Sequence, residues 1–290
     1  MKILLIGAQG QVGFQLQRSL ACLGQLHSTT RLDLDLSDIS AIRSLTNDVK
    51  PDLIVNAAAY TAVDKAEQET ELARQINTIA PAIFAEQAKK LAIPLVHYST
   101  DYVFDGSKNS PWIETDVTGP LSHYGLTKLE GEQAILESEC DHLIFRTSWV
   151  YDRRGHNFLN TMLRLAEERD QLNIVDDQIG TPTWSRHIAD VTALALAQQH
   201  HNEAFWKQNS GIYHLSAAGQ TSWKGFAEAI FKLAEKDGRR VPKVNGIPTT
   251  DYPTPAKRPL NSLMDNSKLQ QHFGLQLPDW QQSLQWVMQS

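Results

Sequence analysis

Short apolar runs alternate with longer helical patterns through the first half of this 290-residue chain. The runs are almost continuously apolar or β-branched, as is typical of parallel strands whose two faces are both covered. They lie at 2–7, 25–30, 52–59, 94–100 and 142–148. The helical patterns between them lie at 11–23, 38–49, 65–91 and 123–138. This order predicts an α/β fold in which helices cover both faces of a doubly wound parallel sheet.

After residue 150 the pattern is less regular. Helices are expected at 156–170, 185–200 and 221–236, and strands at 172–175 and 211–217. Five prolines between 237 and 262 predict an extended loop there rather than regular structure. The main domain is expected to comprise 1–150, with about 183–217 returning to it, and a smaller C-terminal region about 151–182 and 218–290.

The composition limits the classes of partner. There are 33 acidic and 27 basic residues, a formal net charge of −6, and no cluster of Lys and Arg stands out. This argues against nucleic acid as the main partner, although a single bound nucleotide needs only a few donors. The two cysteines fit a reducing compartment. No apolar run approaches the roughly 20 residues of a membrane span, so we expect a cytoplasmic protein with no membrane partner.

The stretch "GAQGQVG" follows the first strand directly and opens the first helix. It places Gly7, Gly10 and Gly13 at the spacing G-x-x-G-x-x-G, with Gln11 and Val12 between the last two. Glycines allow a sharp turn and let backbone N–H groups approach a pyrophosphate at the helix N-terminus. Such triplets also occur in plain loops, but the strand–turn–helix context favours a Rossmann-like domain that binds a dinucleotide. The spacing resembles that of extended short-chain dehydrogenases.

The residues after the second strand bear on the choice of cofactor. An acid at this strand end prefers the free 2′-hydroxyl of NAD, whereas an arginine suits the 2′-phosphate of NADP. Arg31 lies near the strand end and favours NADPH, with NADH still possible; its other interpretation is a solvated loop arginine. The resemblance implies that Asp35 and Leu36 face the adenine. Asp38 is expected to cap the next helix.

The third strand ends in "VNAAAYTAVDKAE". Small side chains there leave room for a cofactor to lie against the backbone, although they would also serve close packing of helix on sheet. The cofactor is expected along Ala58, Ala59, Tyr60 and Thr61. Asp64 is expected to cap the following helix, with Glu67 completing a capping box.

A possible catalytic group combines the fourth strand with the helix after it. Thr100 lies near the end of the strand in "YSTDYVF", where the carboxyl ends of strands line the ligand crevice. Tyr124 and Lys128, four positions apart, would share one helix face. Lys128 is expected to lower the phenol pKa and to bind the nicotinamide ribose. The alternative is a surface pair without function.

Over nearly its whole length the sequence resembles the dTDP-4-dehydrorhamnose reductases. The resemblance is carried by "GAQGQVG", "HYSTDYVFDG", "PLSHYGLTKLEGE", "RTSWVY", "DQIGTPT" and "YPTPAKRPLNS". It implies reduction of the C4 keto group of dTDP-6-deoxy-L-lyxo-4-hexulose (dTDP-4-dehydro-L-rhamnose) by NADPH, the last step in making dTDP-L-rhamnose for bacterial surface polysaccharide such as the O antigen of lipopolysaccharide. It also implies that Thr100, Tyr124 and Lys128 are catalytic.

The same resemblance implies a set of substrate contacts. Besides Thr100 and Tyr124, the substrate-binding residues would be Asp101, Val103, Trp149 and Arg258. Arg258 would meet the dTDP phosphates, because a guanidinium matches phosphate oxygens. Core packing remains an alternative for Trp149, and a surface position for Arg258. Asn77 resembles an asparagine that anchors a proton-relay water in the wider superfamily.

Some members of this family are described as magnesium-bridged dimers that use a glutamate in the first helix. The matching residue here is Gln15, a poorer ligand for Mg²⁺. No metal site is therefore predicted, and the chain is expected to be a monomer or a homodimer. Two other functions stay open: reduction of another nucleotide 4-keto-6-deoxy sugar, and an NADP-binding regulatory subunit like that of methionine adenosyltransferase. The intact Thr100, Tyr124 and Lys128 weigh against the second.

Overall fold

A six-stranded parallel sheet forms the centre of the molecule in a computed structural model that describes residues 1–202 and 204–289. Its order across the sheet is β10 (Gly211–His214), β5 (His142–Thr147), β4 (Leu95–Thr100), β3 (Leu53–Asn56), β1 (Lys2–Ile6) and β2 (Gln25–Thr29). The chain moves outward in opposite directions from β1 and β3. The carboxyl ends of these two strands therefore open a crevice, which is where doubly wound sheets bind ligands.

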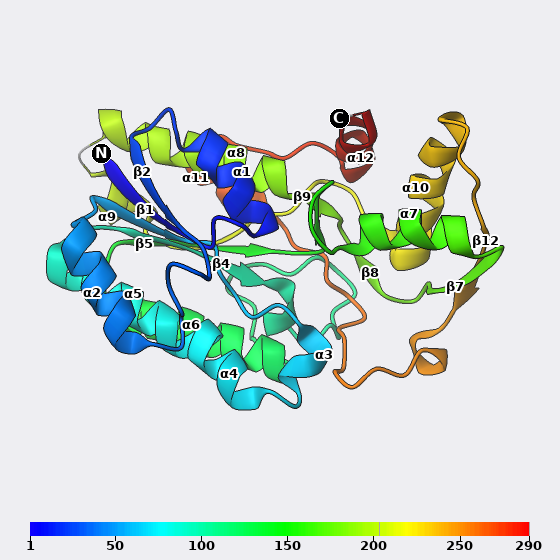
Figure 1. Cartoon of the computed structure of the whole chain (residues 1–290), viewed down its shortest axis with the longest axis horizontal. Helices are drawn as coiled ribbons and strands as arrows, with labels where there is room; N and C mark the ends of the chain where they lie inside the picture. The colour runs from blue at the N-terminus through cyan, green and yellow to red at the C-terminus, as the bar shows by residue number, and fades with distance from the viewer. Residues whose placement is uncertain (203, 290) are drawn as a thin grey trace.

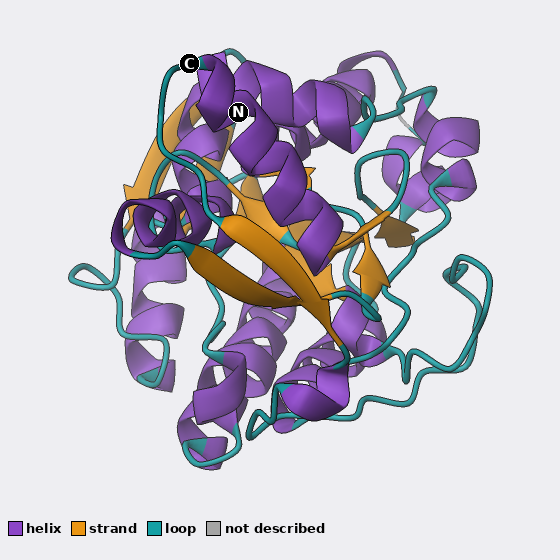
Figure 2. Ribbon diagram, turned by 90° about the vertical axis from the view of Figure 1, so that its right-hand side faces the viewer, coloured by secondary structure: helices purple, strands orange, loops and turns teal. Residues whose placement is uncertain are grey.

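Helices cover both faces of the sheet (Figures 1 and 2). One face carries α1 (Gln11–Ser19), α8 (Ser185–Ala197) and α11 (Ser267–Phe273), and the other carries α2 (Ile39–Val49), α5 (Ala80–Leu91) and α6 (His123–Glu137). Because successive strand residues point to opposite faces, Ile3 and Leu5 pack in the first core cluster and Leu4 and Ile6 in the second. All four are buried, and each such side chain stabilises the fold by about 1.5–3 kcal/mol. The predicted α/β fold is confirmed.

Helix caps explain where two of these helices begin. The Asp38 carboxylate accepts a hydrogen bond of 3.0 Å from the Ala41 N–H, so Asp38 caps α2 as predicted. The Ser122 hydroxyl caps α6 in the same way, accepting from the Gly125 N–H at 3.2 Å. This fixes the first turn of the helix that carries Tyr124.

The prediction of a single helix over 65–91 is wrong. The segment consists of α3 (Val63–Ala66), α4 (Thr70–Arg74), a π-helical turn (Gln75–Ile79) and α5. Pro81 lies in the first turn of α5 and has no N–H to donate to the carbonyl of Asn77, four residues earlier. That carbonyl lies against α6, where a Cβ on Gly131 would be only 2.2 Å from it. The wider turn at Asn77 follows from the missing hydrogen bond.

The capping box expected from Asp64 and Glu67 is also wrong. Helix α3 begins at Val63, and its N-cap residue Ala62 has no side chain to cap it. The Asp64 carboxylate instead accepts from Arg258 at 2.8 Å, and Glu67 accepts from the N–H of His123 at 2.7 Å. Both acids thus join segments that are distant in the sequence.

A third core cluster lies beside the sheet domain, on the right in Figure 1. It is built from α7 (Phe158–Glu168), α10 (Trp223–Lys236) and α12 (Trp280–Gln289), with buried side chains such as Leu159, Phe226 and Leu284. Parallel strands β7 (Gln171–Val175) and β12 (Lys243–Ile247) cover its outer side. Short strand pairs complete the region: β6 (Val150–Tyr151) with β9 (Thr183–Trp184), and β8 (Ile179–Gly180) with β11 (Thr221–Ser222). The short helix α9 (Phe205–Asn209) lies instead with the sheet, where Phe205 packs in the first core cluster.

Strand β12 corrects the expectation of an extended loop over 237–262. None of the five prolines falls inside the strand; Pro242 and Pro248 flank it directly. Proline is tolerated at a strand end, because no ladder hydrogen bond is lost there. Helix α11 and Leu277 pack in the first core cluster, although they lie in the range expected to form the smaller region. In the described part of the chain, no helix combines the length and apolar character needed to cross a membrane.

Candidate functional site

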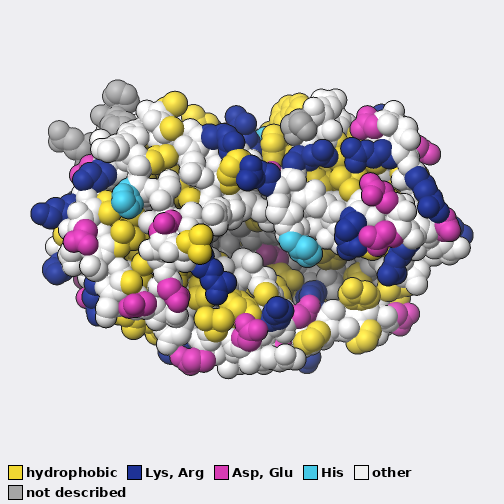
Figure 3. Space-filling view, viewed as in Figure 1, with side chains coloured by type: hydrophobic (Ala, Val, Ile, Leu, Met, Phe, Trp, Pro, Cys, Tyr) yellow, Lys and Arg dark blue, Asp and Glu magenta, His cyan; other side chains and the backbone are white. Residues whose placement is uncertain are grey.

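A cavity of about 800 Å³ opens at the carboxyl edge of the sheet, beside β1 and β3. It appears as a hollow at the centre of the face shown in Figure 3. Its walls come from the glycine turn before α1, the segment after β2, the segment after β3, and the start of α6. The predicted crevice is therefore a real cavity, large enough for a ligand of dinucleotide size.

The glycine turn is packed tightly between neighbouring strands. Gly7 has a φ of +83°, and a Cβ there would lie 2.8 Å from the Ala58 nitrogen. A Cβ on Gly13 would lie 2.0 Å from the Gly7 carbonyl oxygen, so α1 rests directly on the turn. Gly10 is the N-cap of α1 and has no capping side chain, which leaves the first N–H groups of the helix open to an anion.

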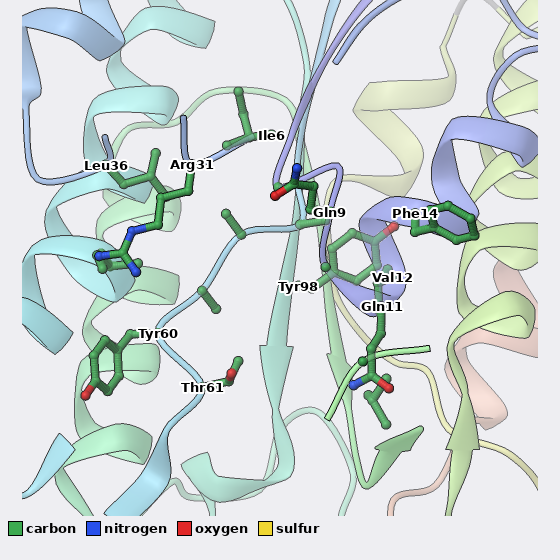
Figure 4. Close-up of a pocket in the computed structure, with 18 of the residues that line it drawn as sticks. Ile6, Gln9, Gln11, Val12, Phe14, Arg31, Leu36, Tyr60, Thr61 and Tyr98 are labelled. Atoms are coloured by element: carbon green, nitrogen blue, oxygen red, sulfur yellow. The ribbon is translucent and has the colours of Figure 1, made fainter. Parts of the chain in front are cut away.

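The predicted cofactor residues lie along one cavity. Arg31 and Leu36 lie with Tyr60 on one side of the close-up in Figure 4, and Gln11 and Val12 lie on the other. The other predicted residues on the cavity wall are Gly7, Gly10, Asp35, Ala58, Ala59, Thr61, Tyr124 and Lys128. Gly13 is the exception, because it does not line the cavity; it allows α1 to pack closely on the turn.

Hydrogen bonds fix the wall after β3 and the acid after β2. The Tyr60 N–H donates to the Asn77 side-chain oxygen at 2.8 Å, and the Tyr60 hydroxyl donates to Glu69 at 2.7 Å. The Asn77 side-chain nitrogen bonds the Tyr60 carbonyl, so this side chain holds the cavity wall. The backbone N–H and hydroxyl of Ser37 bond the Asp35 carboxylate and hold its pKa below the usual range.

Lys128 is fully buried at the inner end of the cavity. Its Nζ donates to the Tyr98 carbonyl at 2.6 Å and lies 3.1 Å from Nε2 of His97. Burial lowers the pKa of Lys128 to about 8, although Glu132 opposes that shift. Burial also lowers the pKa of His97 well below its usual value, and the Lys128 charge adds to this effect, so His97 is neutral. Sequence reasoning missed His97, whose only signal is a polar residue inside a buried strand.

Tyr124 lies on the same helix face and on the cavity wall. Burial raises the pKa of its hydroxyl to about 12, and a hydrogen bond with Thr100 partly offsets the rise. The expectation that Lys128 lowers the phenol pKa is wrong for this structure. The Lys128 ammonium is directed to His97 and the Tyr98 carbonyl, so desolvation of the phenol dominates.

Two of the predicted substrate residues lie near Tyr124 and one does not. The Thr100 hydroxyl donates to the Asp101 carboxylate at 3.1 Å, and burial raises the pKa of that carboxyl to about 6. The side chain of Val103 is fully buried with Phe104 and Trp112, and its contact with a sugar stays a prediction.

Trp149 and Arg258, like Thr100, Asp101 and Val103, are not among the residues that line the cavity. Trp149 has a φ of 46° and stacks on Trp223 with ring centroids 3.6 Å apart. Arg258 forms an ion pair of 2.8 Å with Asp64 and also bonds the Thr254 hydroxyl. Each therefore has a structural partner in this state.

Gln15 is hydrogen-bonded to the loop that follows β6. Its side-chain nitrogen donates to the buried Asp152 carboxylate at 2.8 Å, and the Ser185 hydroxyl bonds the same oxygen. The side-chain nitrogen of Gln15 is therefore engaged within the chain, and a neutral amide is a poorer ligand for Mg²⁺ than a carboxylate. Within 1–202 and 204–289, no group of three or more His, Cys, Asp or Glu side chains could hold a metal ion.

The comparisons with known proteins agree on one family. The family described as RmlD substrate binding domain matches residues 1–290. A dTDP-4-dehydrorhamnose reductase of Burkholderia thailandensis is 50% identical over 284 residues, covering 97% of this chain and 95% of the relative. A crystal structure of a dTDP-4-dehydrorhamnose reductase from Clostridium acetobutylicum has a TM-score of 0.92 at 37% identity, covering 100% of this chain and 99% of that one.

A second solved structure contains a cofactor. It is a dTDP-4-dehydrorhamnose reductase from Bacillus anthracis in complex with NADP, with a TM-score of 0.88 at 33% identity, covering 99% of this chain and 98% of that one. The glycine turn, the cavity and these matches lead to one assignment. The chain belongs to the dTDP-4-dehydrorhamnose reductase family.

Proposed function

We propose that this chain reduces the C4 keto group of dTDP-4-dehydro-L-rhamnose with NADPH and forms dTDP-L-rhamnose. One observation carries the proposal: Tyr124 and Lys128 line the same cavity as the glycine turn, in a chain that is 50% identical over 284 residues to such a reductase. When bound, NADPH supplies the hydride. The residues of this chain bind both ligands, exclude water and deliver a proton to the carbonyl oxygen.

Tyr124 is the proposed proton donor. A phenol with a pKa of about 12 is protonated at neutral pH, which is the state that a general acid needs. The Thr100 hydroxyl, which donates to Asp101 in this state, would turn its single proton to the substrate oxygen and donate a hydrogen bond beside that of Tyr124. Lys128 would hold the nicotinamide ribose from the inner end of the cavity.

The cofactor would lie along the cavity wall from the glycine turn to Arg31. The open N–H groups of α1 suit the pyrophosphate, and the alanines after β3 allow close approach to the backbone. Arg31 would pair with the 2′-phosphate, which favours NADPH over NADH.

The substrate would lie between the sheet domain and the C-terminal region. The division expected from the sequence gives 1–150 and about 183–217 to the cofactor, and about 151–182 and 218–290 to the substrate. The loop 152–157, which lines the cavity, and α11, which packs on the sheet, are exceptions. Asp101 and Trp149 would border the sugar, and Arg258 would meet the diphosphate. The cytoplasmic location and the monomeric or homodimeric state expected from the sequence remain predictions.

Tyr124→Phe tests the assignment of the proton donor. The ring and its packing stay, but the proton for the C4 oxygen is lost, which typically reduces the rate by about 10²–10⁴. We expect kcat to fall in that range while the Kd of NADPH stays within about twofold. NADPH oxidation with the dTDP-keto-sugar gives kcat, and fluorescence titration gives Kd.

Tyr213→Phe is the matched control. Its buried hydroxyl donates to the Asn209 carbonyl at 2.8 Å, away from the cavity, so removal should lower stability by about 1 kcal/mol and leave kcat unchanged. A Tyr124→Phe enzyme with more than about a tenth of the wild-type kcat would contradict the assignment. Turnover of a different nucleotide keto-sugar in preference to the dTDP-sugar would contradict the proposed substrate.

A further inference from the structure

The loop 152–157, which follows β6, is fastened along α1. The Asn157 side-chain nitrogen donates to the Gln11 side-chain oxygen at 2.8 Å, and Gln15 donates to Asp152 at 2.8 Å. Between these two contacts, the Arg154 guanidinium lies 3.6 Å from the centroid of the Phe14 ring. The loop therefore touches successive turns of the helix that begins at the glycine turn.

The same loop has a fixed internal shape. The Asn157 side-chain nitrogen also donates to the backbone carbonyls of Asp152 at 2.7 Å and Arg154 at 3.1 Å. Asn160 donates to the Gly155 carbonyl at 2.9 Å. Gly155 has a φ of +76°, a conformation that side chains other than glycine rarely adopt. These bonds set where the loop presents its basic side chains.

Arg154 and His156 line the same cavity as Gly10, Gln11 and Val12. Lys and Arg side chains and a His lie around the hollow in Figure 3. Among the described residues, the ion pairs involve other basic side chains and leave Arg154 without a carboxylate partner. The nearby Asp152 carboxylate is buried and already bonded to Gln15 and Ser185. The Arg154 guanidinium thus lies near the N-terminus of α1 without a carboxylate partner among the described residues.

We propose that Arg154 and His156 clamp the pyrophosphate of the cofactor from the loop side of the cavity. A guanidinium can donate two parallel hydrogen bonds to phosphate oxygens, while the N–H groups at the start of α1 bind the same pyrophosphate from the helix side. Stacking on Phe14 holds the guanidinium plane in place. The proposal rests on the cofactor lying along the glycine turn. Its distinctive content is that Arg154 recognises a group that NADPH and NADH share.

Direct binding to the full-length enzyme tests the clamp without turnover. Arg154→Ala should raise the Kd of NADPH and of NADH by the same factor, about tenfold, because a charge-assisted hydrogen bond to the pyrophosphate is lost in both. His156→Ala should raise both by a smaller common factor. The Kd of 2′-AMP, which has no pyrophosphate, should not change in either variant.

Two other arginines serve as comparisons. Arg153→Ala changes the neighbouring residue on the same loop, outside the cavity wall, and should leave every Kd unchanged. Arg31→Ala should weaken NADPH and 2′-AMP but not NADH, because only the first two offer a 2′-phosphate. The four variants thus separate the two ends of the cofactor.

Three results would overturn the proposal. The first is a Kd within twofold of wild type for both cofactors in Arg154→Ala. The second is a loss of affinity in Arg154→Ala that is confined to NADPH. The third is an equal loss of affinity in Arg153→Ala. Arg154 is exposed, so its replacement should leave Tm unchanged; if it does not, Arg154→Lys, which keeps the charge but not the planar fork, must recover part of the cofactor affinity. An active Tyr124→Phe enzyme would refute the catalytic assignment and leave these binding results intact.

Discussion

Asp101 is a carboxyl group buried beside the proposed catalytic hydroxyls. Only 2% of its surface is exposed, and desolvation raises its pKa from 3.8 to about 6, although the Thr100 and Ser262 hydroxyls partly oppose the rise. Between pH 4 and pH 6 the folded chain therefore binds more protons at this residue than the unfolded chain does. By linkage, the free energy of unfolding falls as the pH rises through that window.

Asp101→Asn removes this ionisation. Relative to the variant, the wild type should lose on the order of 3 kcal/mol of stability between pH 4 and pH 7, since one pKa unit corresponds to about 1.4 kcal/mol. Urea unfolding at both pH values measures the difference. Asp105→Asn is the control. Hydrogen bonds from Ser107 lower the pKa of that exposed carboxyl, so its contribution to the free energy of unfolding rises with pH instead of falling. Parallel pH profiles for wild type and Asp101→Asn would refute the prediction.

The five strands expected in the first half are all present. Four of them, β1, β3, β4 and β5, are almost completely buried, and a parallel sheet covered on both faces demands nearly continuous apolar runs there. Strand β2 lies at the sheet edge and is half exposed. The wide turn before Pro81 was missed although its cause, a residue without an N–H, is local. Strand β12 was missed because it forms by pairing with β7, which is distant in the sequence. The cofactor wall followed from the glycine turn. The loop carrying Arg154 did not, because its contacts with α1 join residues far apart in sequence.

Gly13→Ala tests how closely α1 must rest on the turn. The new Cβ would lie 2.0 Å from the Gly7 carbonyl oxygen, and backbone on both sides prevents easy relief. We expect a loss of about 1–3 kcal/mol of stability together with weaker NADPH binding, because α1 must shift away from the cavity. Gly119→Ala is the control, since its Cβ would meet only the Asp105 side chain at 3.5 Å. Thermal unfolding and NADPH titration measure both effects; unchanged values in Gly13→Ala would show that the turn tolerates a methyl group.

Within residues 1–202 and 204–289, one ion pair joins the sheet domain to the C-terminal segment. Asp64, in α3, accepts from the Arg258 guanidinium at 2.8 Å and from the Ala256 N–H at 3.2 Å. The segment containing Arg258 passes beside α3 in Figure 1. Arg258 is the residue proposed to meet the substrate diphosphate. We therefore propose that Asp64 is a positioning residue, whose contacts set where that guanidinium lies when substrate arrives.

Asp64→Asn should therefore weaken binding of the substrate and leave binding of the cofactor unchanged. A partly exposed ion pair contributes at most about 1 kcal/mol, so the KM of the dTDP-keto-sugar should rise about fivefold while kcat and the Kd of NADPH stay unchanged. Glu86→Gln, which breaks the Arg43–Glu86 pair between α2 and α5, should change none of the three. Because Asp64 acts through Arg258, Asp64→Asn should have no further effect on KM in an Arg258→Ala background. Independent, additive changes in that double variant would show that Asp64 does not position Arg258.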